Sequence, residues 1–74
     1  MPGIFVRLID EAVEVWRPVE AVHLDGNVYQ IAEQPYDRSI EKWEFEPGDE
    51  VICMPRESPE GRILVAVRFA HLSP

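Results

Sequence analysis

The side chains of this sequence that could do chemistry are carboxylates, two imidazoles and one thiol. The adjacent carboxylates Asp10-Glu11 and Asp49-Glu50 could serve as acid and base only if their surroundings separated their pKa values, and turn and surface positions explain them better. His23, His71 and Cys53 lie far apart in the chain and lack the spacing of zinc ligands. With no phosphate-binding loop or nucleophile triad either, we predict no catalytic residue, no metal and no cofactor.

The most distinctive stretch is VEVWRPVEAVHL, which carries Trp16-Arg17-Pro18 at its middle. Tryptophan and arginine are typical of contact surfaces, whereas proline removes a hydrogen bond from a strand. Simple alternation would bury Arg17 among valines, which is costly for an unpaired charge. We therefore predict a bulge at this triplet that turns the guanidinium outward and forms a corner of the fold, and the same corner could also contact a partner.

Aromatic side chains are the second candidate for binding, because aromatic grooves hold extended, proline-rich peptides. The set comprises Trp16, Tyr29, Tyr36, Trp43 and Phe45. We assign Tyr29 and Phe45 to the core, which leaves Trp16, Tyr36 and Trp43, together with Arg17, as predicted partner-binding residues. The acidic residues around them would suit a basic ligand, although a solvated surface is the better explanation: Asp37, Glu41, Glu44 and Glu46.

Charge and composition narrow the class of partner. Seven basic against fourteen acidic side chains leave a net charge of −7 over 74 residues, which repels nucleic acid phosphates and anionic lipid. No apolar run approaches the roughly 20 residues of a membrane helix, and the N-terminus does not have the pattern of a signal peptide. The single Cys53 fits a reducing compartment. We therefore expect a cytoplasmic protein that binds neither nucleic acid nor membrane.

The elements that must position these residues are short strands. In RILVAVRFA, the residues Ile63, Val65, Val67 and Phe69 fall on one face, which predicts a strand over a core. The segments NVYQIAE and EVICMPRE alternate in the same way, and Cys53 is expected to be a buried small side chain. Near the N-terminus, GIFVRLIDEAVEV favours two strands with a turn at Asp10-Glu11 over a helix.

Turn residues separate these strands. They occur at Asp25-Gly26-Asn27, Pro47-Gly48 and 58–61. The polar stretch 34–42 should be a surface loop with one helical turn at 37–41. Five or six short antiparallel strands with short connections predict a single all-β domain over residues 1–74, closed as a small barrel of the SH3-like kind.

A resemblance rests on four runs: VEVWRPVEA, YQI, WEFEPGDEVIC and LVAV. They resemble a group of short, uncharacterised bacterial proteins that carry a Trp-Arg-Pro-Val run and a later Trp-x-Phe-x-x-Gly. The likeness covers roughly residues 11–67 and implies a stand-alone small β domain with no known activity. FEPGDEV is also similar to a turn found in many SH3-like barrels.

The sequence thus favours a non-enzymatic module that binds another protein or peptide through the Trp16-Arg17 corner and the loop from Tyr36 to Trp43. Two alternatives stay open. The chain could self-associate as a homodimer through the edges of Ile4–Ile9 or Leu64–Phe69, or its acidic surface could inhibit a basic protein. An enzyme whose active site carries no sequence motif is the minor alternative.

Overall fold

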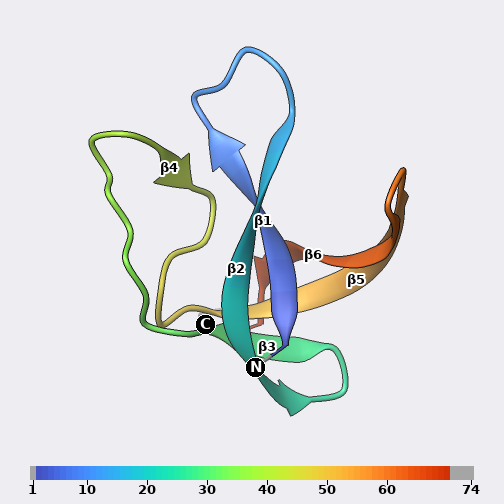
Figure 1. Cartoon of the computed structure of the whole chain (residues 1–74). Coiled ribbons are helices and arrows are strands. Elements are labelled where there is room, and N and C mark those ends of the chain that lie inside the picture. The colour runs from blue at the N-terminus through green and yellow to red at the C-terminus, as the bar shows by residue number, and fades with distance from the viewer. Residues whose placement is uncertain (1, 71–74) are drawn as a thin grey trace.

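The computed structural model describes residues 2–70, which form six β-strands. Figure 1 shows the strands curling around a common centre, with a long loop to one side and a hairpin projecting from the other. The strands are β1 (Gly3–Ile9), β2 (Val15–Asp25), β3 (Val28–Ile31), β4 (Lys42–Trp43), β5 (Glu50–Ser58) and β6 (Gly61–Phe69). No helix occurs in this part of the chain, and so none that could cross a membrane.

Five of the strands close into a ring, which confirms the predicted all-β, barrel-like fold. The order is β2-β3-β5-β6-β1, and β1 pairs again with β2. Strands of the ring that follow one another in the chain pair antiparallel. Because the ring holds an odd number of strands, the first and the last strand run in the same direction. The closing pair, Phe5 opposite Val65, is accordingly parallel. The short β4 attaches to the end of β1, with Trp43 opposite Leu8.

The turns form where the sequence predicts them. Residues 10–14 connect β1 to β2, and Gly26 and Gly61 have positive φ angles of 49° and 118° in the two hairpin turns. At Gly48, with φ of 94°, the Asp49 amide donates to the Glu46 carbonyl at 3.0 Å. Glycine has no Cβ to clash in this region of backbone space, which is why these positions carry it.

The core lies inside the ring and is built from the alternate residues of each strand. Its fully buried members include Ile4, Val6, Ala21, Ile31, Val51 and Cys53. Phe45 is buried as expected, whereas Tyr29 is half-buried, packs against the core and stacks on His23 with ring centroids 4.7 Å apart. Cys53 is a free thiol, 1% exposed, which confirms its assignment as a small core side chain.

The predicted bulge at Trp16-Arg17-Pro18 is wrong. Pairing of β2 with β1 runs without a register shift from Val15 to Glu20, and the shifts lie instead between His23 and Asp25 and between Ile52 and Cys53. Arg17 needs no bulge, although it lies opposite the buried Val6, because its side chain reaches out to a partner on the loop before β4. There its guanidinium stays half exposed and meets the carboxylate of Glu41.

Strand β6 also departs from simple alternation. The register shift opposite Ile52 and Cys53 leaves Val67 without a paired residue and changes the face that the following residues present. Ala66, before the shift, lies opposite the buried Cys53 and is itself buried, whereas Val67 is 42% exposed. After the shift Phe69 lies opposite the buried Val51, although its own side chain is 52% exposed. Phe69 still rests edge-on against Phe45, with ring centroids 4.9 Å apart.

Candidate functional site

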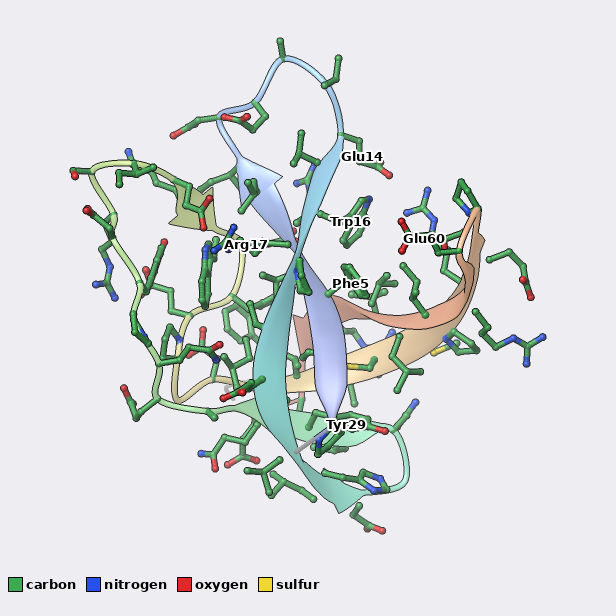
Figure 2. All side chains as sticks on the ribbon, in the orientation of Figure 1. Phe5, Glu14, Trp16, Arg17, Tyr29 and Glu60 are labelled. Atoms are coloured by element: carbon green, nitrogen blue, oxygen red, sulfur yellow. The ribbon has the colours of Figure 1, made fainter. Side chains whose placement is uncertain are left out.

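Trp16 and Arg17 lie on opposite faces of β2. Figure 2 shows the Trp16 indole directed toward the hairpin of β5 and β6 and the Arg17 side chain directed toward the loop that carries β4. This is the ordinary alternation of a strand, undisturbed because no bulge intervenes. The pair predicted as one contact corner therefore belongs to two separate sites.

On the hairpin side, Trp16 is held by two charged residues. Its indole nitrogen donates to Glu14 Oε1 at 2.8 Å, and the Arg56 guanidinium lies 5.2 Å from the ring centroid. Arg56 also pairs with Glu14 at 3.0 Å. The indole hydrogen bond and then the Arg56 charge hold the pKa of the Glu14 carboxyl below its ordinary value. The group fastens the projecting hairpin to β2, around a narrow hollow of about 200 Å³.

On the other side, Glu41 joins Arg17 to Trp43. Its Oε1 atom accepts the Trp43 indole hydrogen at 2.8 Å and lies 2.9 Å from Arg17 Nε. Trp43 is only 4% exposed, so this hydrogen bond satisfies a donor that has little access to water. One carboxylate thus couples a strand of the ring to the loop before β4.

A stack of three side chains builds the floor of this side. The rings of Tyr36 and Trp43 lie 4.3 Å apart with an interplanar angle of 19°, and the Arg38 guanidinium covers the Tyr36 ring at 4.5 Å. The Tyr36 hydroxyl accepts the Trp43 amide at 2.7 Å. Arg38 is fixed in turn by Glu46, whose Oε2 accepts from Nε at 3.0 Å and whose pKa is lowered by that bond.

The loop is ordered by a single turn at 37–41, as predicted. The Asp37 carbonyl accepts from the amides of Ile40 and Glu41, at 3.1 and 3.2 Å. The Asp37 carboxylate accepts the Ser39 hydroxyl and amide, which lower its pKa, the hydroxyl having the larger effect. Aspartate closes turns in this way because its short side chain reaches the backbone two residues ahead.

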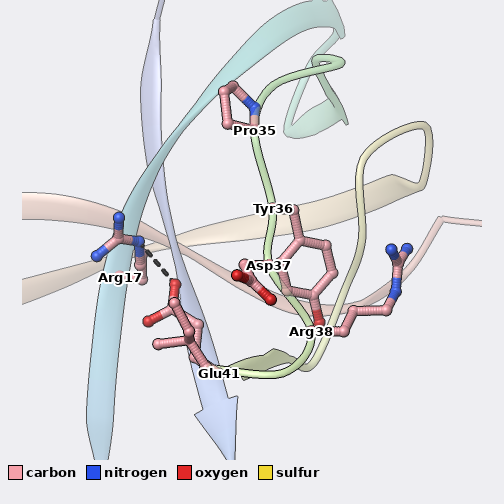
Figure 3. A pocket seen from close by; sticks show the side chains of 7 residues that line it. Arg17, Pro35, Tyr36, Asp37, Arg38 and Glu41 are labelled. Atoms are coloured by element: carbon pink, nitrogen blue, oxygen red, sulfur yellow. Dashed lines mark ion pairs between the residues drawn. The ribbon is translucent and has the colours of Figure 1, made fainter.

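These elements enclose an open groove of about 650 Å³ between β2 and the loop, shown in Figure 3. Its walls are Arg17, Pro35, Tyr36, Asp37, Arg38, Ile40 and Glu41. Ile40 is 78% exposed, the most exposed large apolar side chain of residues 2–70. The lining carries two guanidinium groups and two carboxylates, so the groove is close to neutral on a protein of charge −7. We call these seven residues the Tyr36 groove.

Three of the four predicted binding residues are brought together here. Arg17 and Tyr36 line the groove, and Trp43 supports it from beneath with its ring buried. Trp16 is on the opposite face. Pro35, Arg38 and Ile40 are not among the predicted binding residues, although Arg38 and Ile40 lie in the predicted binding loop. An isolated isoleucine between Ser39 and Glu41 in a polar loop is a recognisable signal of an exposed contact.

The remaining candidates for chemistry have structural surroundings. Among residues 2–70 no three His, Cys, Asp or Glu side chains gather in a way that could hold a metal ion, and His71 lies outside the described residues. Asp10 pairs with Lys42 at 3.5 Å, and Asp49 accepts the Glu46 amide at 2.8 Å. Burial raises the pKa of the Cys53 thiol to about 11.

Comparison with known proteins gives no relative. No protein family, no curated protein and no solved structure matches the chain. The resemblance to short bacterial proteins therefore stays a prediction, and function must be argued from the site.

Proposed function

We propose that the protein is a non-enzymatic interaction module that binds an extended segment of another protein in the Tyr36 groove. The observation that carries the proposal is the exposure of Ile40 beside Pro35 and Tyr36, on a floor fixed by stacking and hydrogen bonds. A rigid aromatic floor loses little conformational entropy on binding, and an exposed apolar side chain at its rim gains contact area.

The groove also specifies the chemistry of the segment. An apolar side chain of the ligand would rest between Ile40 and Tyr36. Arg17 meets Glu41 through Nε, and its two terminal nitrogens point away from that carboxylate in Figure 3. They can donate to a carbonyl or carboxylate of the ligand. Because the lining charges balance, the contact should depend little on salt.

A matched pair of variants tests the proposal. Ile40 and Val13 are both exposed loop residues, at 78% and 72%, but only Ile40 lines the groove. A protein recovered by the tagged wild type from lysate of the source cells should be lost with Ile40→Asp and kept with Val13→Asp. Both variants should melt within a few degrees of wild type. Equal recovery by the two variants would remove the groove as the binding site.

A second candidate is the inhibition of a basic protein by the acidic surface. Six of the seven basic side chains form ion pairs within residues 2–70, namely Arg7, Arg17, Arg38, Lys42, Arg56 and Arg62. These pairs neutralise the cations, so the surplus charge of the protein is negative and would attract a cationic partner. A complex of this kind should weaken steeply as salt rises from about 50 to 500 mM, in contrast to binding in the groove.

We also propose a cytoplasmic location. It is supported by Cys53, the one cysteine of the chain, which lies buried as a free thiol. Reducing compartments favour proteins that use no disulfide. Fractionation of the source cells tests this directly, and recovery of the protein in a secreted or membrane fraction would contradict it.

A further inference from the structure

The outer face of the sheet formed by β2, β3, β5 and β6 carries several exposed apolar side chains. Val51 and Cys53 point into the core, so Ile52 and Met54 between and after them point outward. Val22, Leu24 and Met54 are 40%, 45% and 47% exposed, and Val28 and Ile52 are half-buried between them. This surface is separate from the Tyr36 groove and shares no residue with it.

One row of residues crosses all four strands of this face. Asp25 on β2 lies opposite Val28 on β3, Val28 lies opposite Ile52 on β5, and Ile52 lies opposite Arg68 on β6. Directly opposed residues point to the same side of a sheet. The row therefore has the Asp25 carboxylate at one end, two apolar side chains in the middle and the Arg68 guanidinium at the other end.

Arg68 differs from every other lysine and arginine of the chain. It is the only one for which residues 2–70 provide no ion-pair partner. Asp25, at the other end of the row, takes part in no ion pair within the same residues. An exposed apolar face with an unmatched charge at each end is suited to a partner that presents the reverse order of charges.

We propose that the partner is a second copy of this chain, packed face to face on this row. A two-fold axis parallel to the strands reverses the row, so that Arg68 of each copy faces Asp25 of the other and Val28 faces Ile52. A single surface is then complementary to itself, as the symmetry of a two-fold dimer requires. The excess of acidic residues also favours this occupant, since Arg68 requires a carboxylate and each copy supplies one at the matching position.

This arrangement differs from pairing through strand edges. The stretch Ile4–Ile9 is not an edge, because β1 lies between β2 and β6 in the ring and also pairs with β4. The face-to-face dimer uses side chains and leaves the ring intact. It also leaves the Tyr36 groove of both copies open, so the two proposals can fail independently.

Charge exchange tests the dimer. Sedimentation equilibrium of the whole protein should show a dimer for wild type. Concentrations from about 5 to about 500 µM cover a hundredfold range around ordinary dimer affinities. Arg68→Asp and Asp25→Arg should each weaken association at least tenfold, and the double variant Asp25→Arg/Arg68→Asp should restore it. Circular dichroism and melting show that each variant folds.

Arg62→Asp is the matched control, because Arg62 is an exposed arginine of the same strand that pairs with Glu57 away from the row. It should leave the dimer unchanged. A wild-type protein that stays monomeric at the highest concentration overturns the proposal, as does a dimer that survives Arg68→Asp. Failure of the double variant to recover association would also contradict the pairing of Arg68 with Asp25.

Discussion

Trp16 and Arg17 are neighbours in the chain, yet each is fixed by a different carboxylate on a different face of β2. Trp16 donates to Glu14 at 2.8 Å beside the β5–β6 hairpin, and Arg17 meets Glu41 at 2.9 Å at the Tyr36 groove. The two side chains should therefore have separable roles, one in stability and one in binding.

Exchange of Trp16 for alanine should destabilise the protein without affecting the groove. Removal of the half-buried ring abolishes the contact with Arg56 and leaves a gap under the hairpin. The expected loss in the free energy of unfolding is about 1–2 kcal/mol. The melting temperature should fall by roughly 4–16 °C, given about 4–8 °C per kcal/mol in a domain of this size. Arg17→Ala should do the reverse, with lost binding and a nearly unchanged melt, because its ion pair with Glu41 is partly exposed. Equal melting losses would show that both residues are structural.

The role of Glu41 can be divided by two substitutions. Glu41→Gln keeps an oxygen for the Trp43 indole but removes the charge that faces Arg17, whereas Glu41→Ala removes both. The glutamine variant should lose at most about 0.5 kcal/mol, because the ion pair is partly exposed. The alanine variant should lose about 1–3 kcal/mol, because a buried donor is left without a partner. Urea unfolding followed by tryptophan fluorescence measures both, and a glutamine variant as unstable as the alanine variant would contradict this division.

Cys53 should make the protein sensitive to alkali. Its pKa is raised from 9.0 to about 11 by burial, so the folded state holds the thiol proton more tightly than the unfolded state does. The resulting stability is complete below pH 9 and is lost as pH rises toward 11. Cys53→Ala should flatten this part of the stability curve. Thiol reagents at pH 8 should modify the wild type only as fast as it opens, and rapid modification of the folded protein would refute the burial of the thiol.

The hairpin between β5 and β6 depends on Gly61. With φ of 118°, an alanine there would adopt a backbone conformation that residues with a Cβ rarely occupy, at a cost of about 1–3 kcal/mol. Gly3 is the matched control, because its φ is not positive and an added Cβ would lie 3.9 Å from the nearest heavy atom, the Val19 carbonyl oxygen. Thermal melts should show a loss for Gly61→Ala and little change for Gly3→Ala. A similar loss of stability in both variants would mean that strand packing, and not the turn conformation, explains the destabilisation.

Most of the fold could be predicted from local signals. Glycines at tight turns and alternating apolar residues act over a few positions, and they located the strands, the hairpins and the single turn at 37–41. The register shifts could not be found in this way. A shift at Ile52 and Cys53 depends on how two distant strands pair, and it leaves Val67 unpaired and 42% exposed.

The candidate site was predicted in part for the same reason. Tyr36, Trp43 and Arg17 were singled out by residue type, but type alone does not say which tryptophan is buried. The sequence predicts a bulge because no partner for Arg17 lies near it in the chain. The actual partner, Glu41, lies 24 residues farther along. Only the folded loop brings the two together, and with them the exposed Ile40.

The parallel pair of Phe5 and Val65 has a consequence for synthesis. These residues belong to β1 and β6, so the ring cannot close until β6 has left the ribosome, long after β1. Until then β1 has β2 on one side and only the two-residue β4 at the end of the other, so most of that second edge is open to any strand that comes near. The nascent chain is therefore at its greatest risk of aggregation just before β6 emerges, when a chaperone would protect it most.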